Sequence, residues 1–282
     1  MRAPRGVLAF FACTAPLSGC SSGQDCTALV DRGQGSPGTV CGVTSATLPV
    51  EPGYGAPVVD ATVNGTPVKL LLDTGSSAPL LSSTQLLGAA NHTWVSGVDL
   101  CVGALCFAGV QAYVENSPFT DGAPGDTQGV MGAAILSDLT YELDHLKAVT
   151  LSLGGPSCSG SSVAFTLNAA LQPVVAAQFD GVTPSMPVLL DTGATETVLD
   201  TATAALLGAQ LTAGQQPASV CTVNGCTADG GFESTLQAVC VGAHCAQNVT
   251  VKYPAWDAVG VTYFSAFHVA FDNAKTKLVF CN

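Results

Sequence analysis

The sequence predicts an all-β protein built from two similar lobes, with only short helices. Thirty-one glycines and 16 prolines among 282 residues indicate many turns, as an all-β fold requires. A hydrophobic content of 48% with only 10% charged residues is typical of a folded chain. The third observation is a repeat, because one pattern of strands and turns occurs once in each half of the chain.

The repeat centres on a strand that ends in Asp-Thr-Gly. Three aliphatic residues precede this triplet in each half, within residues 70–77 and again within residues 188–195. Such a run predicts a strand that is buried on both faces and ends at a tight turn. Two strands of this kind, related by a pseudo-two-fold axis, would bring Asp73 and Asp191 face to face.

The residues after each Asp support that arrangement. Gly75 and Gly193 allow a second backbone to approach closely, and Thr74 and Thr192 can form hydrogen bonds across to the partner loop. We therefore expect these four residues to support the loops that carry the two carboxylates.

The other elements of the repeat follow in the same order in both halves. A hairpin with an Asn-Gly or Asp-Gly turn precedes each Asp-Thr-Gly strand. A short capped helix that stops at a glycine follows it, and then come a hydrophobic-Gly strand and a terminal strand. The matched segments are 57–65 and 173–181, 82–88 and 200–208, 130–133 and 258–261, and 139–144 and 267–272.

This arrangement resembles the aspartic peptidases, in which two such lobes each give one catalytic Asp. The resemblance covers most of residues 57–282 and implies a bilobal pair of acid-protease barrels, with lobes at 57–156 and 173–282. Each lobe is short, with 59 positions from Asp to Gly in the first (132 − 73) and 69 in the second (260 − 191). That compactness is similar to retropepsins fused in tandem, and the end of the second lobe is similar to pepsins.

In aspartic peptidases a flap hairpin folds over the substrate, and in pepsins the first lobe supplies it. Here only 12 residues separate the first short helix from the next cysteine (101 − 88 − 1), against 31 in the second half (240 − 208 − 1). The second lobe therefore holds an extra hairpin around residues 221–226. The first lobe has lost its flap or shortened it to residues 94–97, so we predict that any flap is the second-lobe hairpin.

The cysteines predict a disulfide framework. Ten remain once Cys13 and Cys20 are set aside, which is an even number in a chain expected to be exported. Three pairs enclose a glycine-containing loop of four residues, which brings each pair together across a hairpin. These pairs are Cys101–Cys106, Cys221–Cys226 and Cys240–Cys245. A zinc site from the last two pairs is the rival, but zinc prefers two-residue knuckles. Three pairings of the other four cysteines are open, of which we favour Cys26–Cys41 and Cys158–Cys281.

The N-terminal residues predict that the protein is exported and anchored by a lipid. Residues 1–19 have the pattern of a secretion signal, with two arginines before an apolar run. Their ending, Leu-Ser-Gly followed by Cys20, resembles a bacterial lipobox, in which the cysteine is lipidated; an ordinary signal with an incidental cysteine is the alternative. Ser21 favours, by resemblance, the outer membrane of the cell envelope. We expect residues 20–56, rich in Ser, Gly, Pro and Thr, to form a tether.

The composition also limits the partners. A net charge of −12, which becomes −14 without the two arginines of the leader, argues against nucleic acid. The expected partners are a peptide or protein substrate and, through the N-terminal lipid, the membrane, and we expect a monomer. The histidines show no metal spacing, and the chemistry implied by the resemblance requires no metal and no organic cofactor.

Two carboxylates that share a site cannot both ionise easily, so one pKa rises and the other falls. The resemblance implies that the ionised Asp takes a proton from a bound water while the other Asp donates to the amide carbonyl. It also implies that Ser76 hydrogen-bonds its Asp. Because Ala194 has no hydroxyl, we expect Asp191 to be the less firmly ionised carboxylate.

The predicted function is therefore that of an aspartic endopeptidase working outside the cytoplasm. The alternative from another class is a catalytically inactive pair of lobes that serves as a binding module at the membrane. A third hypothesis is a peptidase that processes one partner protein rather than digesting generally. Both intact Asp-Thr-Gly triplets favour an enzyme.

Overall fold

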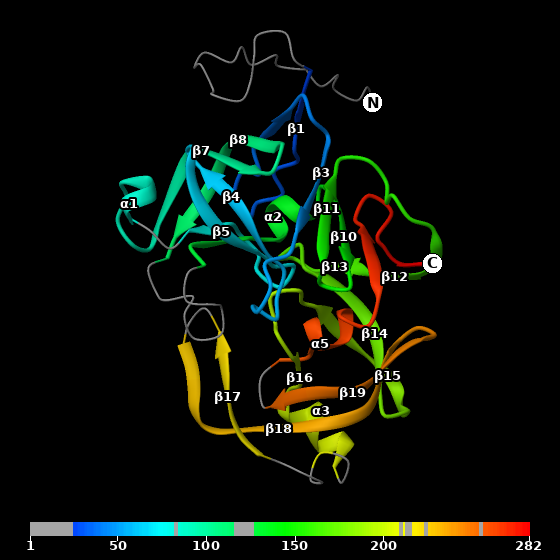
Figure 1. Ribbon diagram of the computed structural model, residues 1–282. Helices are drawn as coiled ribbons and strands as arrows, with labels where there is room; N and C mark the ends of the chain where they lie inside the picture. Colours follow the sequence, from blue (N-terminus) through cyan, green and yellow to red (C-terminus); the bar gives the residue numbers. More distant parts are fainter. Residues whose placement is uncertain are drawn as a thin grey trace, which may run out of the picture.

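The computed structural model (Figure 1) describes residues 25–81, 84–115, 127–208, 211, 216–222, 225–253 and 256–282. At residues 84–85, 182–184, 216–222 and 225–230 it describes the backbone alone. Strands make up 53% and helices 8% of the structure, which confirms the all-β prediction. Among the described residues no helix is both long enough and apolar enough to cross a bilayer.

Six strands of the first half close into a barrel. Their order around it is β8-β6-β9-β5-β4-β7, and β7 pairs again with β8 to complete the circle. Asn64 and Gly65, at the β4–β5 turn, have φ angles of 49° and 78°, as a tight Asn-Gly hairpin requires. The strands are β4 (Val58–Val63), β5 (Thr66–Leu72), β6 (Leu80–Leu81), β7 (Thr93–Val102), β8 (Leu105–Val114) and β9 (Gly129–Met131).

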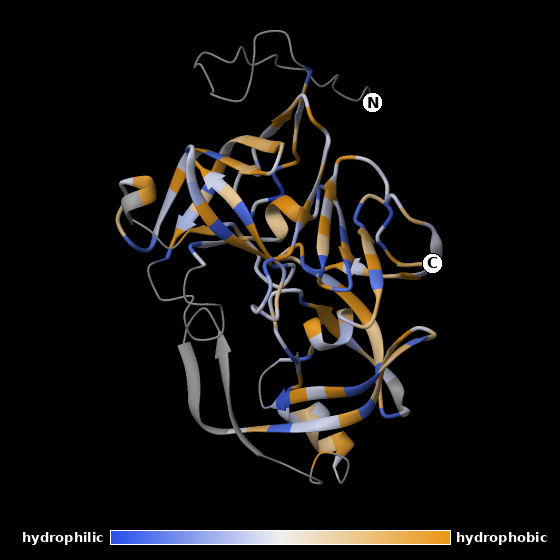
Figure 2. Cartoon of the chain, in the orientation of Figure 1, coloured by the Kyte–Doolittle hydropathy of each residue, from blue (hydrophilic) through white to orange (hydrophobic). Residues whose placement is uncertain are grey.

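The second half builds the matching barrel in the order β14-β15-β20-β16-β19-β18, closed by the pairing of β14 with β18. Two further strands, β13 (Thr166–Leu167) and β17 (Gln216–Thr222), extend the sheet beyond the circle. The barrel strands are β14 (Pro173–Phe179), β15 (Val182–Leu190), β16 (Thr197–Val198), β18 (Gly225–Val241), β19 (His244–Tyr253) and β20 (Ala258–Val259). In Figure 2 apolar residues alternate with polar ones along the barrel strands, as strands with one buried face require.

A third sheet of six antiparallel strands joins the two halves, in the order β12-β22-β21-β10-β11-β3. Its middle pair, β10 and β21, brings Glu142 of the first half opposite Ala270 of the second. The strands are β3 (Ser45–Pro49), β10 (Thr140–Asp144), β11 (Ala148–Ser152), β12 (Gly160–Ala164), β21 (His268–Asp272) and β22 (Lys277–Cys281). The short helices are α1 (Thr84–Leu87), α2 (Ala133–Leu136), α3 (Thr201–Leu207) and α5 (Val261–Phe264).

The prediction of a tether over residues 20–56 is wrong for its described part, residues 25–56. Strands β1 (Cys26–Ala28) and β2 (Thr39–Cys41) extend the first sheet, and β3 pairs with β11 in the central sheet (Figure 1). The alternation in β3 buries Ala46 and Leu48 in the main core. The strands are short and lie between Gly and Pro residues, so their periodicity is weak in the sequence even though their tertiary partners bury them.

Disulfides fasten the hairpins and the chain ends. Cys101 joins Cys106 and Cys240 joins Cys245, each pair opposite across a hairpin. Cys26 joins Cys41, and Cys158 joins Cys281 at the end of β22. The backbone register also pairs Cys221 with Cys226, although the side chains of that predicted disulfide lie outside the described part of the structure.

Candidate active site

Strands β5 and β15 deliver the two Asp residues to one place. Leu70 and Leu72 of β5 are fully buried in the main core, whereas Leu71 belongs to a separate small cluster on the opposite face. Asp73 lies two residues beyond Leu71 and so shares its face. The backbone N–H of Asp73 donates to Met131 O (3.1 Å), and that of Asp191 donates to Val259 O (3.0 Å). Each Asp is therefore fixed at the end of a buried strand.

The two Thr residues lock the loops together beneath the carboxylates. Thr74 Oγ1 donates to Leu190 O (2.5 Å), and Thr192 Oγ1 donates to Leu72 O (2.7 Å). Each hydroxyl also accepts the backbone N–H of the opposite Thr, both at 3.1 Å. Thr74 and Thr192 are 3% and 0% exposed, so these bonds between the halves form without competition from water.

The glycines let each loop lie against the Asp of the other half. A Cβ atom added to Gly75 would lie 2.3 Å from Asp191 Cγ, and one added to Gly193 would lie 2.2 Å from Asp73 Cγ. No side chain fits at either position. Asp73 and Asp191 are buried, and each interacts electrostatically with the other. The structure thus brings together all six residues that the repeat predicted for the two loops.

Backbone donors hold the two carboxylates in nearly the same way. Asp73 Oδ1 accepts the N–H groups of Gly75 (2.7 Å) and Ser76 (3.0 Å). Asp191 Oδ1 accepts those of Gly193 (2.9 Å) and Ala194 (3.1 Å). These bonds stabilise the ionised form of whichever carboxylate carries the charge.

The expected hydrogen bond from the Ser76 hydroxyl to Asp73 is absent from the described site. Ser76 Oγ instead donates to Ala78 O at 3.1 Å. The Asp73 carboxylate oxygen Oδ1 already accepts two backbone N–H groups, and the hydroxyl bonds a carbonyl two residues ahead instead. Ser76 therefore contacts Asp73 through its backbone N–H and not through the hydroxyl that the resemblance implied.

Burial shifts the pKa of both Asp residues in the same direction. Burial raises the pKa of Asp73 well above its ordinary value, and the charge of Asp191 raises it further. Burial also raises the pKa of Asp191, but hydrogen bonds from Asp73, from the N–H groups of Ala194 and Gly193, and from Trp256 oppose that rise. Burial therefore favours one proton shared by the pair over two ionised carboxylates. That Asp191 is the less firmly ionised carboxylate stays a prediction.

Gln172 also supports the site, and sequence reasoning missed it. Its Nε2 donates to the carbonyl oxygen of Gly75, whose peptide unit carries the Ser76 N–H that donates to Asp73. A hydrogen bond on one side of a peptide strengthens the bond on the other. Asn168 Oδ1 in turn holds the Gln172 N–H (3.1 Å), which fixes the loop before β14. The repeat offered a signal for this role. Gln172 precedes Pro173 in the second half, whereas Ala56, which has no polar side chain, precedes Pro57 at the matching position of the first.

The predicted second-lobe hairpin forms from β17 and the first half of β18, which pair from Gln216 with Glu233 to Thr222 with Gly225. In Figure 1 this hairpin leaves the second barrel, and its free end points toward the first half. Between α1 and β7 the described residues 88–92 contain no strand, and Trp94 belongs to the barrel strand β7. Among the described residues, the first barrel therefore has no strand that corresponds to β17.

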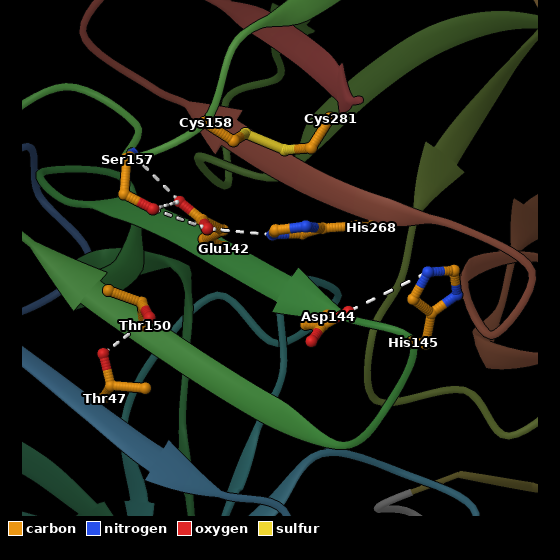
Figure 3. Close-up of polar contacts among 9 residues, drawn as sticks. All are labelled: Thr47, Glu142, Asp144, His145, Thr150, Ser157, Cys158, His268 and Cys281. Atoms are coloured by element: carbon orange, nitrogen blue, oxygen red, sulfur yellow. Dashed lines mark hydrogen bonds and ion pairs between the residues drawn. A yellow bond between two sulfur atoms is a disulfide. The ribbon is translucent and has the colours of Figure 1, made fainter.

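Figure 3 shows one cluster of metal-ligand type on the central sheet. Ligand atoms of Glu142, Cys158, His268 and Cys281 lie within 4.8 Å of one another. The two sulfur atoms are bonded to each other, which removes them from any ligand set. His268 Nε2 contacts Glu142 Oε1 at 2.8 Å, and Ser157 Oγ donates to the same carboxylate. This cluster fastens the central sheet, since Glu142 and His268 come from different halves.

Comparison with known proteins finds one family match, and it falls on the second barrel. Residues 175–254 match a protein family described as "gag-polyprotein putative aspartyl protease". The matched segment, less than a third of the chain, runs from β14 to the end of β19 and contains Asp191. No curated protein matches the chain. The second barrel is therefore similar in sequence to the aspartyl protease domains that this family describes.

We expect Thr74→Val to weaken the junction between the halves. Valine keeps the shape but leaves the Leu190 carbonyl and the Thr192 N–H buried without a partner, which costs about 2–4 kcal/mol of the free energy of unfolding. Urea unfolding followed by circular dichroism measures the loss. Thr74→Ser, which keeps the hydroxyl, is the matched control, and equal losses in both variants would contradict the assigned bonds.

The raised pKa of Asp73 predicts a pH-dependent stability. A carboxyl group whose pKa is higher in the folded state favours folding below its unfolded pKa and loses that contribution as the pH rises to the folded value. Asp73→Asn, which is always neutral, avoids the loss. Its free energy of unfolding should therefore gain on the wild type as pH rises from about 4 to neutrality, by about 1.4 kcal/mol for each pH unit between the two pKa values.

Paired urea titrations at acid and neutral pH measure this gain. Asp31→Asn removes an exposed carboxylate and serves as the control. A gain that stays constant with pH, or one that Asp31→Asn reproduces, would show that Asp73 is not held protonated in the folded protein.

Proposed function

We propose that this protein is an aspartic endopeptidase that hydrolyses peptide bonds with a water activated by Asp73 and Asp191. The observation that carries the proposal is the pair of buried carboxylates, each at the end of a strand and each with its pKa raised by burial. A buried carboxyl pair that shares one proton contains both an acid and a base, which is what amide hydrolysis by water requires.

The proposed reaction divides the two roles, with Asp191 as the base and Asp73 as the acid. Asp191, ionised, takes a proton from the attacking water as its oxygen bonds to the peptide carbonyl carbon. Asp73 donates its proton to the carbonyl oxygen, so the tetrahedral intermediate is neutral at that oxygen. When the C–N bond breaks, the leaving nitrogen takes the proton from Asp191, and the carbonyl re-forms by returning its proton to Asp73. No covalent adduct with the protein is formed.

The hairpin of β17 and β18 is proposed to cover the bound peptide. It belongs to the second half, and the first half has no described strand that could pair in the same way. A hairpin that closes over the carboxylates would exclude water and orient the peptide bond. An extended peptide or a loop of a protein is the substrate class that such a closure suits.

We expect Asp73→Asn and Asp191→Asn each to lower cleavage by about a thousandfold or more, because each removes one of the two proton-transfer groups. The assay is wild-type protein on a peptide mixture from acid to neutral pH, with products identified by mass spectrometry. Asp60→Asn changes an exposed carboxylate on β4 and should cleave normally. Far-ultraviolet circular dichroism should show all three variants folded.

Two outcomes would count against the enzyme. Substantial cleavage by either dyad variant would exclude the shared-water mechanism. Wild-type protein that binds peptides but cleaves none, with its disulfides formed, would instead support an inactive binding module.

We also propose that the protein is exported and held at the cell envelope by a lipid on Cys20, with the outer membrane favoured over the inner. This proposal rests on the sequence of residues 1–21, since residues 1–24 lie outside the described structure. The disulfides of the described chain suit an oxidising compartment.

Cys20→Ser removes the only atom that can take the lipid under this proposal. The variant should move from the membrane fraction to the soluble fraction after cell disruption, whereas Ser21→Ala should stay with the membrane. A Cys20→Ser protein that still sediments with membranes would show that another segment anchors it.

A further inference from the structure

The cluster on the central sheet in Figure 3 gathers donor groups from three neighbouring strands. Glu142 of β10 lies opposite Ala270 of β21, which in turn lies opposite Val279 of β22. His268 stands two residues before Ala270, and Cys281 stands two residues after Val279, so both side chains lie on the face that carries Glu142. The disulfide at Cys281 brings the loop between β11 and β12 to the same place.

The donor atoms of this cluster are close enough to surround one ion. One carboxylate oxygen, one imidazole nitrogen and two sulfur atoms lie within 4.8 Å of one another. Zinc takes these three kinds of ligand in tetrahedral sites, with bonds of about 2.0–2.3 Å, which places neighbouring ligand atoms about 3–4 Å apart. Among the residues that the structure describes, no other group of three or more such ligands gathers this closely. The four residues are Glu142, Cys158, His268 and Cys281.

The carboxylate of the cluster is already oriented. Glu142 is 6% exposed, and Ser157 donates to it through its backbone N–H (3.0 Å to Oε2) and through its hydroxyl (2.8 Å to Oε1). His268 Nε2 contacts Oε1 at 2.8 Å. The ligands of metal sites are held in this way by hydrogen bonds from the residues behind them. The oxygen and nitrogen donors are therefore in place before an ion arrives.

The disulfide is the obstacle, since sulfur atoms that are bonded to each other do not ligate zinc. A dithiol reductant supplies the two electrons and two protons that convert the S–S bond of Cys158 and Cys281 into two thiols, and it is itself oxidised to a disulfide. Zinc then displaces both thiol protons as it binds the two thiolates. Reduction thus completes a ligand set of two sulfurs, one nitrogen and one oxygen.

We propose that these four residues bind a zinc ion when the Cys158–Cys281 disulfide is reduced. Zinc and the disulfide are then alternative cross-links at one place. The disulfide joins the segment between the barrels to the last strand, whereas zinc also joins Glu142 of the first half to His268 of the second. The tie between these segments thus survives reduction. The inference is independent of the proposed function, because neither carboxylate of the Asp pair takes part.

Cobalt(II) is the probe, because it replaces zinc in such sites and its absorption reports tetrahedral coordination by thiolates. Protein reduced with a phosphine and kept free of oxygen should bind one equivalent of cobalt tightly, with a thiolate-to-metal band that zinc abolishes. Glu142→Gln and His268→Phe keep every cysteine, and each should weaken the affinity at least about a hundredfold, whereas Ser157→Ala should weaken it about tenfold. Circular dichroism of the oxidised variants checks that each folds.

Two double variants separate this site from the other reduced cysteines. Cys101→Ser with Cys106→Ser removes an equal number of sulfur atoms at a hairpin of the first barrel and should leave the tightly bound cobalt in place. Cys158→Ser with Cys281→Ser should abolish it. Tight binding that persists in this second double variant, or an unchanged affinity in either Glu142→Gln or His268→Phe, would overturn the proposal. Reduced wild-type protein that gives no cobalt band would overturn it as well.

Alkylation locates the metal without any variant. Zinc at ten times its dissociation constant leaves about a tenth of the site free, so the reaction of Cys158 and Cys281 with iodoacetamide should slow about tenfold. Cys101 and Cys106 should react at an unchanged rate, with both pairs followed by mass spectrometry of peptides. Equal protection of both pairs, or protection of neither, would contradict the proposal. None of these measurements uses peptide cleavage, so this inference and the peptidase proposal fail separately.

Discussion

The exchange of hydrogen bonds between Thr74 and Thr192 is the constraint on which the site depends. Each hydroxyl donates to a backbone carbonyl of the other half and accepts a backbone N–H from it, at a place that water does not reach. Separating the halves would leave several buried polar groups unpaired, at a cost well above that of an ordinary surface contact. These bonds therefore fix the distance between the carboxylates of Asp73 and Asp191, which directly precede the two Thr residues.

The rest of the molecule resists movement of this junction. The central sheet pairs β10 of the first half with β21 of the second, so a continuous backbone ladder joins the two halves. His268 and Glu142 add a contact between the halves, and the Cys158–Cys281 disulfide fastens the edge of the same sheet. Strand β3, from the N-terminal segment, extends the sheet on the other side. Contacts at both edges of the central sheet thereby hold the two halves, and with them the two Asp-Thr-Gly loops, in place.

The symmetry of the backbone contrasts with the asymmetry of its side chains. Both carboxylates accept two backbone N–H groups in the same pattern, yet among the described residues a glutamine acts through the loop peptide of Asp73 and has no counterpart at Asp191. The second barrel carries the hairpin strand β17, which has no counterpart among the described residues of the first. Differences of this kind allow two similar acids to take different roles in one reaction.

The sequence by itself determined the all-β class, the two Asp-Thr-Gly loops and the cysteine hairpins, because each depends on residues a few positions apart in the chain. Only the tertiary structure decided the partners of single side chains. Gln172 reaches Gly75 across 97 positions, the Ser76 hydroxyl turns to a nearby carbonyl, and β3 finds its place only through β11. Local pattern cannot specify such contacts, since they arise from how two distant segments are packed and not from the period of either one.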